Sequence, residues 1–239
     1  MNLETALWDE QTYAVFLKYL RSFADEKLKK FHEKIINDEL KTEIIGVRTP
    51  VMRDIARRIS KGDYKSFLKF NTYKTHEEKM IAGILIGLVK IEYPELMRML
   101  KDFVPHISNW GLTDITAIKF KQIEKNKTQA LTEITAFLHS ENPWEIRLGL
   151  ILLLALYVDA EYIEACLAAA ASVRDTHYYV RMGNAWLLSV CYIKFPEQTA
   201  ALFKKNILNP WTQNKAVQKI RESLRVSPQE KENVLVYKR

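Results

Sequence analysis

The chain has 239 residues, enough to bury the core of one or two domains, and its seven Gly and seven Pro residues are few, which predicts a largely helical protein. A net charge of +7 permits binding to a polyanion. The longest apolar run, residues 148–158, is too short for a membrane span, and no signal-peptide pattern is visible, so we expect a cytoplasmic protein with no membrane partner.

The first third of the chain predicts four helices without a regular repeat. Their apolar periodicity covers residues 9–24, 26–38, 49–60 and 63–70. Thr49 is the expected N-cap of the third segment and Pro50 its first helical residue.

A repeat of about 34 residues follows. Its aromatic or histidine anchors are separated by 34, 34, 34 and 33 residues: His76, Trp110, Trp144, Tyr178 and Trp211. Each anchor follows a residue suited to cap a helix: Thr75, which forms a capping box with Glu78, then Ser108, Asn142, Thr176 and Asn209. A second apolar segment completes each period, so each period predicts a helical hairpin.

A single hairpin cannot bury its apolar face, and stacking several of them gives a solenoid. We therefore expect an all-α fold, an α-solenoid of HEAT-like helical hairpins with a concave basic cleft. The tetratricopeptide pattern has the same period, but its Trp, Leu-Gly and Tyr signature is absent. We expect one domain over residues 1–239: irregular helices over about 1–72, regular hairpins over about 73–225, and a tail over about 226–239.

Neither cysteine nor histidine is spaced for metal binding. Cys166 and Cys191 lie in apolar helical segments without a CxxC pair, and the five histidines are scattered. We expect two buried thiols and no metal site.

Comparison of equivalent repeat positions shows one unusual carboxylate. Four places after the anchors stand Met80, Asp114, Leu148, Met182 and Lys215. Asp114 should share a helix face with Trp110 and Ile118, because a step of four residues advances only about 40° around a helix. On the same stripe, Trp186 stands where three of the other four hairpins carry an aliphatic residue, and three places after the anchors stand Arg147 and Arg181.

These residues have structural alternatives as well as a functional interpretation. A Trp on an apolar stripe is usually packed in the core, Asp114 can lie on a polar helix edge or pair with Arg147, and the arginines can cover a solvated face. If neighbouring hairpins present these side chains together, however, they form a wall of carboxylate, indoles and cations. Such a wall suits cleavage of an N-glycosidic bond, because a carboxylate stabilises the oxocarbenium-like sugar that develops.

The charge distribution agrees with a DNA substrate. Residues 41–70 hold eight Lys or Arg residues against three Asp or Glu residues, and residues 201–239 hold nine against three. Basic regions of this kind bind phosphates, although solvated helix faces give the same counts.

At these residues the sequence resembles the AlkD-type alkylpurine DNA glycosylases, a HEAT-like repeat family of DNA alkylation repair. The similar segments are "IIGVRTPVMRDIA" at 44–56, "NWGLTD" at 109–114, "NPWEIRLGLIL" at 142–152 and "VRMGNAWLL" at 180–188. The resemblance implies a monofunctional glycosylase without a cofactor that removes cationic N3- or N7-alkylated purines from double-stranded DNA without flipping the base.

The resemblance also assigns residues. Trp110, Asp114 and Trp186 correspond to lesion-facing side chains, and Arg147 corresponds to an arginine that contacts the DNA backbone. Further candidates for DNA contact are Arg181, Trp144, Arg48, Arg53, Lys215 and Lys219. Two departures from the family pattern are Asn109, where active members often carry a second Trp, and the N-terminal aromatic, for which Phe31 is the candidate.

The leading hypothesis is therefore an alkylpurine DNA glycosylase that acts as a monomer. The alternative is a non-catalytic HEAT-like protein that binds damaged or branched DNA. A protein-interaction scaffold fits the two basic regions least well.

Overall fold

A computed structural model describes residues 1–4, 7–36, 38–117, 120–174 and 176–239. Ile118, expected on the same helix face as Trp110 and Asp114, lies outside these residues. Over the described ranges the protein is all-α and contains no strand; Glu43 and Thr75 form an isolated parallel bridge.

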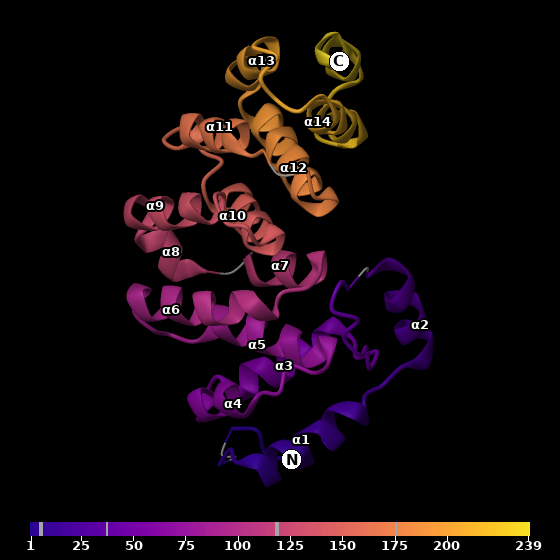
Figure 1. The fold of residues 1–239 in the computed structure, drawn as a ribbon, viewed down its shortest axis with the longest axis vertical. Helices are drawn as coiled ribbons and strands as arrows, with labels where there is room; N and C mark the ends of the chain where they lie inside the picture. Colours follow the sequence, from indigo (N-terminus) through magenta and orange to yellow (C-terminus); the bar gives the residue numbers. More distant parts are fainter. Residues whose placement is uncertain (5–6, 37, 118–119, 175) are drawn as a thin grey trace. The chain divides into compact units, whose positions relative to one another are not determined.

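The helices follow one another in the order that the sequence predicts (Figure 1). They are α1 (Glu10–Arg21), α2 (Glu26–Ile35), α3 (Thr49–Ile59), α4 (Tyr64–Phe70), α5 (His76–Leu88), α6 (Tyr93–Phe103), η1 (Val104–His106), α7 (Trp110–Ala117), α8 (Lys121–Lys125), α9 (Lys127–Phe137), α10 (Pro143–Leu156), α11 (Ile163–Ser172), α12 (Tyr178–Lys194), α13 (Pro196–Lys204), α14 (Pro210–Glu222), α15 (Pro228–Asn233) and η2 (Val234–Tyr237). The four predicted N-terminal helices are α1 to α4. Each repeat anchor lies within the first two residues of α5, α7, α10, α12 or α14, which confirms the predicted hairpins.

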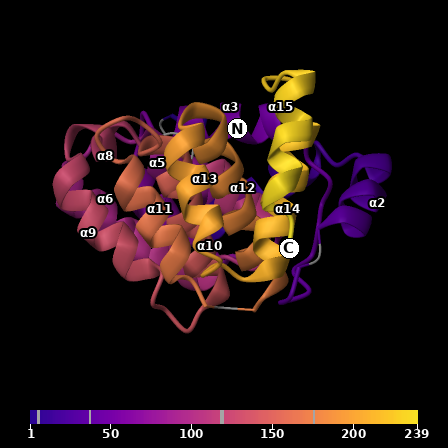
Figure 2. The same ribbon diagram turned by 90° about the horizontal axis from the view of Figure 1, so that it is seen from above.

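The chain forms two compact units, residues 1–122 and 123–239. In the first unit, α5 packs between α3 and α7 (Figure 1). In the second unit, α12 packs between α10 and α14 (Figures 1 and 2). The first helices of successive hairpins are thus neighbours within each unit, as expected for stacked helical repeats. One domain over the whole chain stays a prediction.

Side-chain caps fix several of the helix starts. Thr75 and Glu78 form the predicted capping box of α5, and Asn142 and Asn209 cap α10 and α14. Three predicted caps were wrong by one residue. The N-cap positions of α3 and α12 are Arg48 and His177, not Thr49 and Thr176. At α7, Asn109 accepts from the backbone N–H of Leu112, while the hydroxyl of Ser108 donates to Asp38 instead.

Residues 226–239, expected as a tail, form α15 and η2. The side chain of Val234 is fully buried, and the ring of Tyr237 lies 5.7 Å from that of Phe203. The amide of Gln213 on α14 donates to the carbonyl of Tyr237 at 2.7 Å. Aromatic packing and this hydrogen bond therefore hold the C-terminal segment against α13 and α14.

The start of α5 buries three consecutive charged residues, each of which bonds to a different segment. The carboxylate of Glu77 accepts from the backbone N–H groups of residues 45, 46 and 47 at 2.8–3.2 Å. That of Glu78 accepts from the hydroxyl of Tyr13 at 2.8 Å, which ties α1 to α5. The ammonium of Lys79 donates to the hydroxyls of Thr42 and Ser108. These bonds replace the water that the charges lose on burial.

Gly46 is required in the segment that Glu77 holds. Its φ of +90° lies in the region that favours glycine, and a Cβ there would lie 2.5 Å from the carbonyl oxygen of Asp25. Its own carbonyl accepts from the N–H of Asp25, so the start of α2 packs directly on this segment.

Both cysteines are fully buried, as predicted. Burial raises the pKa of the Cys166 thiol to about 12 and also raises that of Cys191. The thiols are therefore protonated at neutral pH and unreactive. In the described part of the chain, no helix is both long enough and apolar enough to cross a bilayer.

We predict that Glu77→Ala lowers the free energy of unfolding by about 3 kcal/mol or more, because three buried N–H groups lose their acceptor. Urea unfolding measures this loss. Glu33→Ala, which removes an exposed carboxylate from α2, is the control and should change stability by less than about 0.5 kcal/mol. Equal losses in the two variants would contradict the role given to Glu77.

Candidate functional site

Trp110 and Asp114 lie one helical turn apart on α7, and both are partly exposed. The hydroxyl oxygen of Thr113 lies 2.9 Å from Oδ1 of Asp114 and 2.9 Å from the carbonyl oxygen of Trp110, so its single hydrogen is shared between these two acceptors. At the equivalent positions, Met80 and Leu148 are buried. Asp114 therefore does not place a charge in a buried stripe, because its position on α7 reaches the surface.

Asn109, which departs from the family's Trp pair, is fully buried at the start of α7. Its Oδ1 accepts from the N–H of Leu112 at 3.2 Å, and its Nδ2 donates to Asp38 at 2.9 Å. The same Nδ2 lies 3.4 Å from Nδ1 of His76. Asn109 thus caps the helix that carries Trp110 and Asp114, and it fixes that helix to two other segments.

The connection between α2 and α3 supports the same helix start. Oδ2 of Asp38 accepts from the hydroxyl of Ser108 at 2.8 Å as well as from Asn109. The indole N–H of Trp110 donates to the carbonyl of Ile35 at 3.2 Å. Asp38 was not among the predicted site residues, because no periodic pattern marks a residue in an irregular connection.

The end of α2 brings Phe31 to the same region of the first unit. Phe31 lies one turn before Ile35, and 55% of its surface is exposed. None of the residues of α2 is buried. Phe31, the candidate for the N-terminal aromatic, therefore lies on a solvent-exposed helix, and the last carbonyl of that helix accepts a hydrogen bond from Trp110.

In the second unit, the side chains of Trp144 and Arg147 on α10 pack against the start of α12. Trp144 is 4% exposed and packs against the rings of His177 and Tyr179 at 5.5 and 5.3 Å. Arg147 is 5% exposed, and its Nη1 donates to the carbonyl of Tyr179 at 2.8 Å. A Cβ at Gly183 would lie 3.3 Å from this Nη1, so the glycine lets the arginine lie close against α12.

Arg181 and Trp186 lie on different sides of α12, because five residues turn a helix by about 140°. Trp186 is partly exposed, as are Met182 and Val190, each four residues away on the same side. The guanidinium of Arg181 lies 4.6 Å from the ring centroid of Trp211 on α14. The two side chains therefore leave α12 in different directions, and their convergence on one ligand stays a prediction.

The third residue after the anchor connects neighbouring hairpins in both units. Lys79 bonds to Ser108, Arg147 bonds to Tyr179, and Arg181 lies on Trp211, in each case at the start of the next hairpin. Thr113 instead bonds within its own helix. The basic residues that the repeat aligned thus each contact the start of the next hairpin within their unit.

The other predicted DNA-binding residues are distributed over both units. Arg48 pairs with Asp25 at 2.7 Å yet keeps 68% of its side chain exposed, and Arg53 is exposed on α3. Lys215 and Lys219 are partly exposed on α14. Trp110 and Asp114 belong to the first unit and the predicted residues from Trp144 onward belong to the second, so their convergence stays a prediction.

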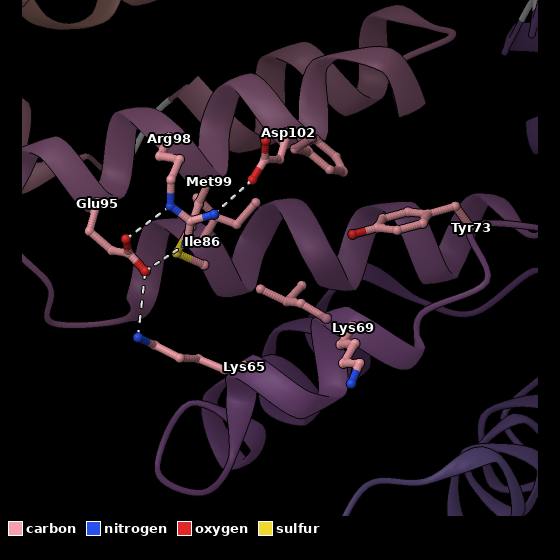
Figure 3. Close-up of a pocket in the computed structure, with 10 residues that line it drawn as sticks. Lys65, Lys69, Tyr73, Ile86, Glu95, Arg98, Met99 and Asp102 are labelled. Atoms are coloured by element: carbon pink, nitrogen blue, oxygen red, sulfur yellow. Dashed lines mark hydrogen bonds and ion pairs between the residues drawn. The ribbon is translucent and has the colours of Figure 1, made fainter.

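A cavity of about 280 Å³ lies between α4, α5 and α6, and no predicted site residue lines it (Figure 3). Arg98 pairs with Glu95 at 2.9 Å and with Asp102 at 3.1 Å, and Lys65 lies 3.5 Å from Glu95. Four of the charged groups on its rim are therefore paired with one another, while Lys69 lies apart from them (Figure 3). No cluster of three metal-ligating side chains occurs among the described residues.

Comparison with known protein families shows which family the chain belongs to. The model of the DNA alkylation repair enzyme family matches residues 16–220, most of the chain. The chain belongs to the DNA alkylation repair enzyme family. This membership confirms the resemblance and supports a role in DNA repair with DNA as substrate. No curated protein matched the sequence.

We predict that Asp38→Ala loosens the start of α7, because the Ser108 hydroxyl and the Asn109 amide lose a shared acceptor. Amide hydrogen exchange should become faster in α7 and stay unchanged in α12. Asp54→Ala, which removes an exposed carboxylate from α3, is the matched control. If Asp38→Ala leaves exchange in α7 unaltered, Asp38 does not support this helix.

His76 should make stability depend on pH. Its pKa is lowered from 6.5 to about 4, mainly by burial and also by His32 and Lys79, while Glu77 and Asp38 oppose the shift. Between these pKa values the unfolded chain binds a proton that the folded protein does not. Stability is therefore highest above about pH 6.5 and falls as the pH approaches about 4, by up to about 3 kcal/mol.

Urea unfolding at neutral pH and at about pH 5 tests this dependence. His76→Gln, which cannot take up a proton, should lose less stability than the wild-type protein over the same interval. An identical loss in both proteins would show that His76 is not the group responsible.

Proposed function

We propose that the protein is a monofunctional DNA glycosylase that hydrolyses the N-glycosidic bond of cationic N3- or N7-alkylated purines in duplex DNA. One observation carries the proposal: Asp114 is a partly exposed carboxylate one turn from a partly exposed indole, Trp110. Membership of the DNA alkylation repair family supports the substrate.

The positive charge of an alkylated purine allows a site with one carboxylate to cleave the bond. When the bond between the sugar C1′ and the purine breaks, its electron pair goes to the purine nitrogen, and the cationic base leaves neutral. No general acid is needed for this departure. Positive charge develops on the sugar, and water then adds to C1′ and loses a proton. A fixed carboxylate beside the sugar lowers the energy of the charged transition state.

The contacts of Asp114 favour this electrostatic role. The hydroxyl of Thr113 shares its hydrogen between Oδ1 of Asp114 and the carbonyl oxygen of Trp110, and this contact restricts the orientation of the carboxylate. A group that is oriented before the reaction needs little reorganisation when charge develops. The face of the Trp110 indole would add to the stabilisation of the sugar cation.

The remaining site residues take supporting roles in this proposal. Trp186 supplies a second partly exposed indole, and Arg181 supplies a partly exposed cation for phosphate. Because Trp144 and Arg147 are almost fully buried, we assign to them the positioning of the start of α12. The protein would hold the lesion's sugar and phosphates while the base remains stacked, as the family resemblance implies.

We predict that Asp114→Asn, which keeps the shape of the side chain and removes its charge, slows release of 7-methylguanine from methylated duplex DNA by about 100-fold or more. Chromatography of the released bases measures the rate. Asp102→Asn removes an exposed carboxylate from α6 of the same unit and should leave the rate unchanged. Equal rates for wild type and Asp114→Asn would refute the assignment.

The alternative function is non-catalytic binding of damaged or branched DNA. It is favoured by one observation: Asn109, which stands where active family members often carry a second Trp, is fully buried as the cap of α7 and offers no ring to a lesion. Tight, salt-dependent binding by the wild-type protein without release of any alkylated base would support it over the glycosylase.

A further inference from the structure

The second unit carries a cluster of aromatic and cationic side chains at the starts of α12 and α14. We call Tyr178, Arg181, Trp211 and Lys215 the Trp211 cluster. We propose that the Trp211 cluster binds a DNA strand next to an unpaired base, with phosphates on the two cations and the base on the ring of Tyr178. This binding site goes beyond base excision and does not require Asp114.

Trp211 gathers both cations on one ring. The guanidinium carbon of Arg181 lies 4.6 Å from its ring centroid, and the ammonium nitrogen of Lys215 lies 5.7 Å from it. The backbone of Trp211 is fixed at the start of α14, because its N–H donates to the N-cap side chain of Asn209 at 2.9 Å. The two positive groups therefore both lie against one indole ring.

Their charges are not balanced by carboxylates in the described part of the chain. Neither Arg181 nor Lys215 forms a salt bridge there, and the hydrogen bond of Lys215 goes to the neutral amide of Gln218 at 2.7 Å. Nε of Arg181 is buried and has no hydrogen-bond acceptor among the described protein atoms. Elsewhere in this unit, Lys127 pairs with Asp159 at 2.6 Å. Two neighbouring cations without a counterion repel each other, and a bound phosphate relieves that repulsion.

Tyr178 adds an aromatic surface beside these cations. Its ring lies edge-on to Trp211, with centroids 5.8 Å apart, and contacts the ring of Tyr179 at 5.1 Å. Even so, 51% of the residue is exposed. The ring is therefore held by its neighbours while much of it remains accessible to a ligand.

A nucleic acid with an unpaired base can bind both the cations and the exposed aromatic ring of the cluster. Phosphates bind cations in any DNA, but the bases of an intact duplex are already stacked and leave no face for Tyr178. Proteins that bind single strands combine cations along the backbone with aromatic rings under the bases. The Trp211 cluster should therefore prefer a duplex with a single-stranded extension to the same duplex with blunt ends.

Fluorescence anisotropy with labelled, unmodified DNA tests the preference. We expect the wild-type protein and Tyr178→Phe to bind the extended duplex about tenfold more tightly than the blunt one. Tyr178→Ser should bind the two duplexes about equally, because it loses the ring but no charge. If the wild type does not discriminate, or if Tyr178→Ser discriminates as strongly, the stacking role is overturned.

The salt dependence of binding tests the cations. Replacing both Arg181 and Lys215 with Gln should lower affinity for both duplexes and reduce the slope of log affinity against log salt by about two. Lys204→Gln, an exposed lysine on α13, is the control for charge alone and should lower neither affinity nor slope measurably. If Lys204→Gln lowers the affinity and the slope as much for each charge removed as the double variant does, the cluster is not a specific phosphate site.

The outcome is independent of the proposed glycosylase activity, because the DNA in these assays contains no alkylated base. Base release by Asp114→Asn at the wild-type rate would refute the catalytic role of Asp114 and would not bear on the binding role of the Trp211 cluster. Loss of the extension preference in the wild type would refute the cluster alone.

Discussion

The buried start of α5 determines how the first unit is built. Glu77, Glu78 and Lys79 lie next to each other and are almost inaccessible to water, so each has to find partners within the protein. Glu77 fixes residues 45–47, Glu78 fixes α1 through Tyr13, and Lys79 fixes the residues just before α7. Three segments far apart in sequence are thereby set around one helix end, and α7 is among the elements that depend on it.

This constraint extends to the candidate site through a chain of hydrogen bonds. Lys79 bonds to Ser108, Ser108 and Asn109 share Asp38, and Asn109 caps α7. At the surface end of the chain, Thr113 orients the carboxylate of Asp114. Buried, fully bonded polar groups specify one arrangement more strictly than apolar packing does. A catalytic carboxylate that works by fixed electrostatics needs this kind of support.

The sequence predicts the helices well and the contacts of individual side chains less well. The 34-residue spacing locates the start of each hairpin, because capping residues and apolar periodicity are local signals. Asp38 meets Ser108 and Asn109 across about 70 residues of chain, and no local pattern encodes that contact. The burial of Trp144 and Arg147 could not be predicted either, because an indole or guanidinium at a repeat position can pack between helices or lie on a DNA-binding surface.

The family match and the repeat thus lead to the same chemical question, whether Asp114 stabilises a positive sugar. Binding of two DNA duplexes answers it most directly, one with a cationic pyrrolidine in place of the lesion's sugar and one with a neutral tetrahydrofuran. The account predicts that the wild-type protein binds the cationic duplex at least about tenfold more tightly, and that Asp114→Asn binds both about equally. The same preference in both proteins would contradict it.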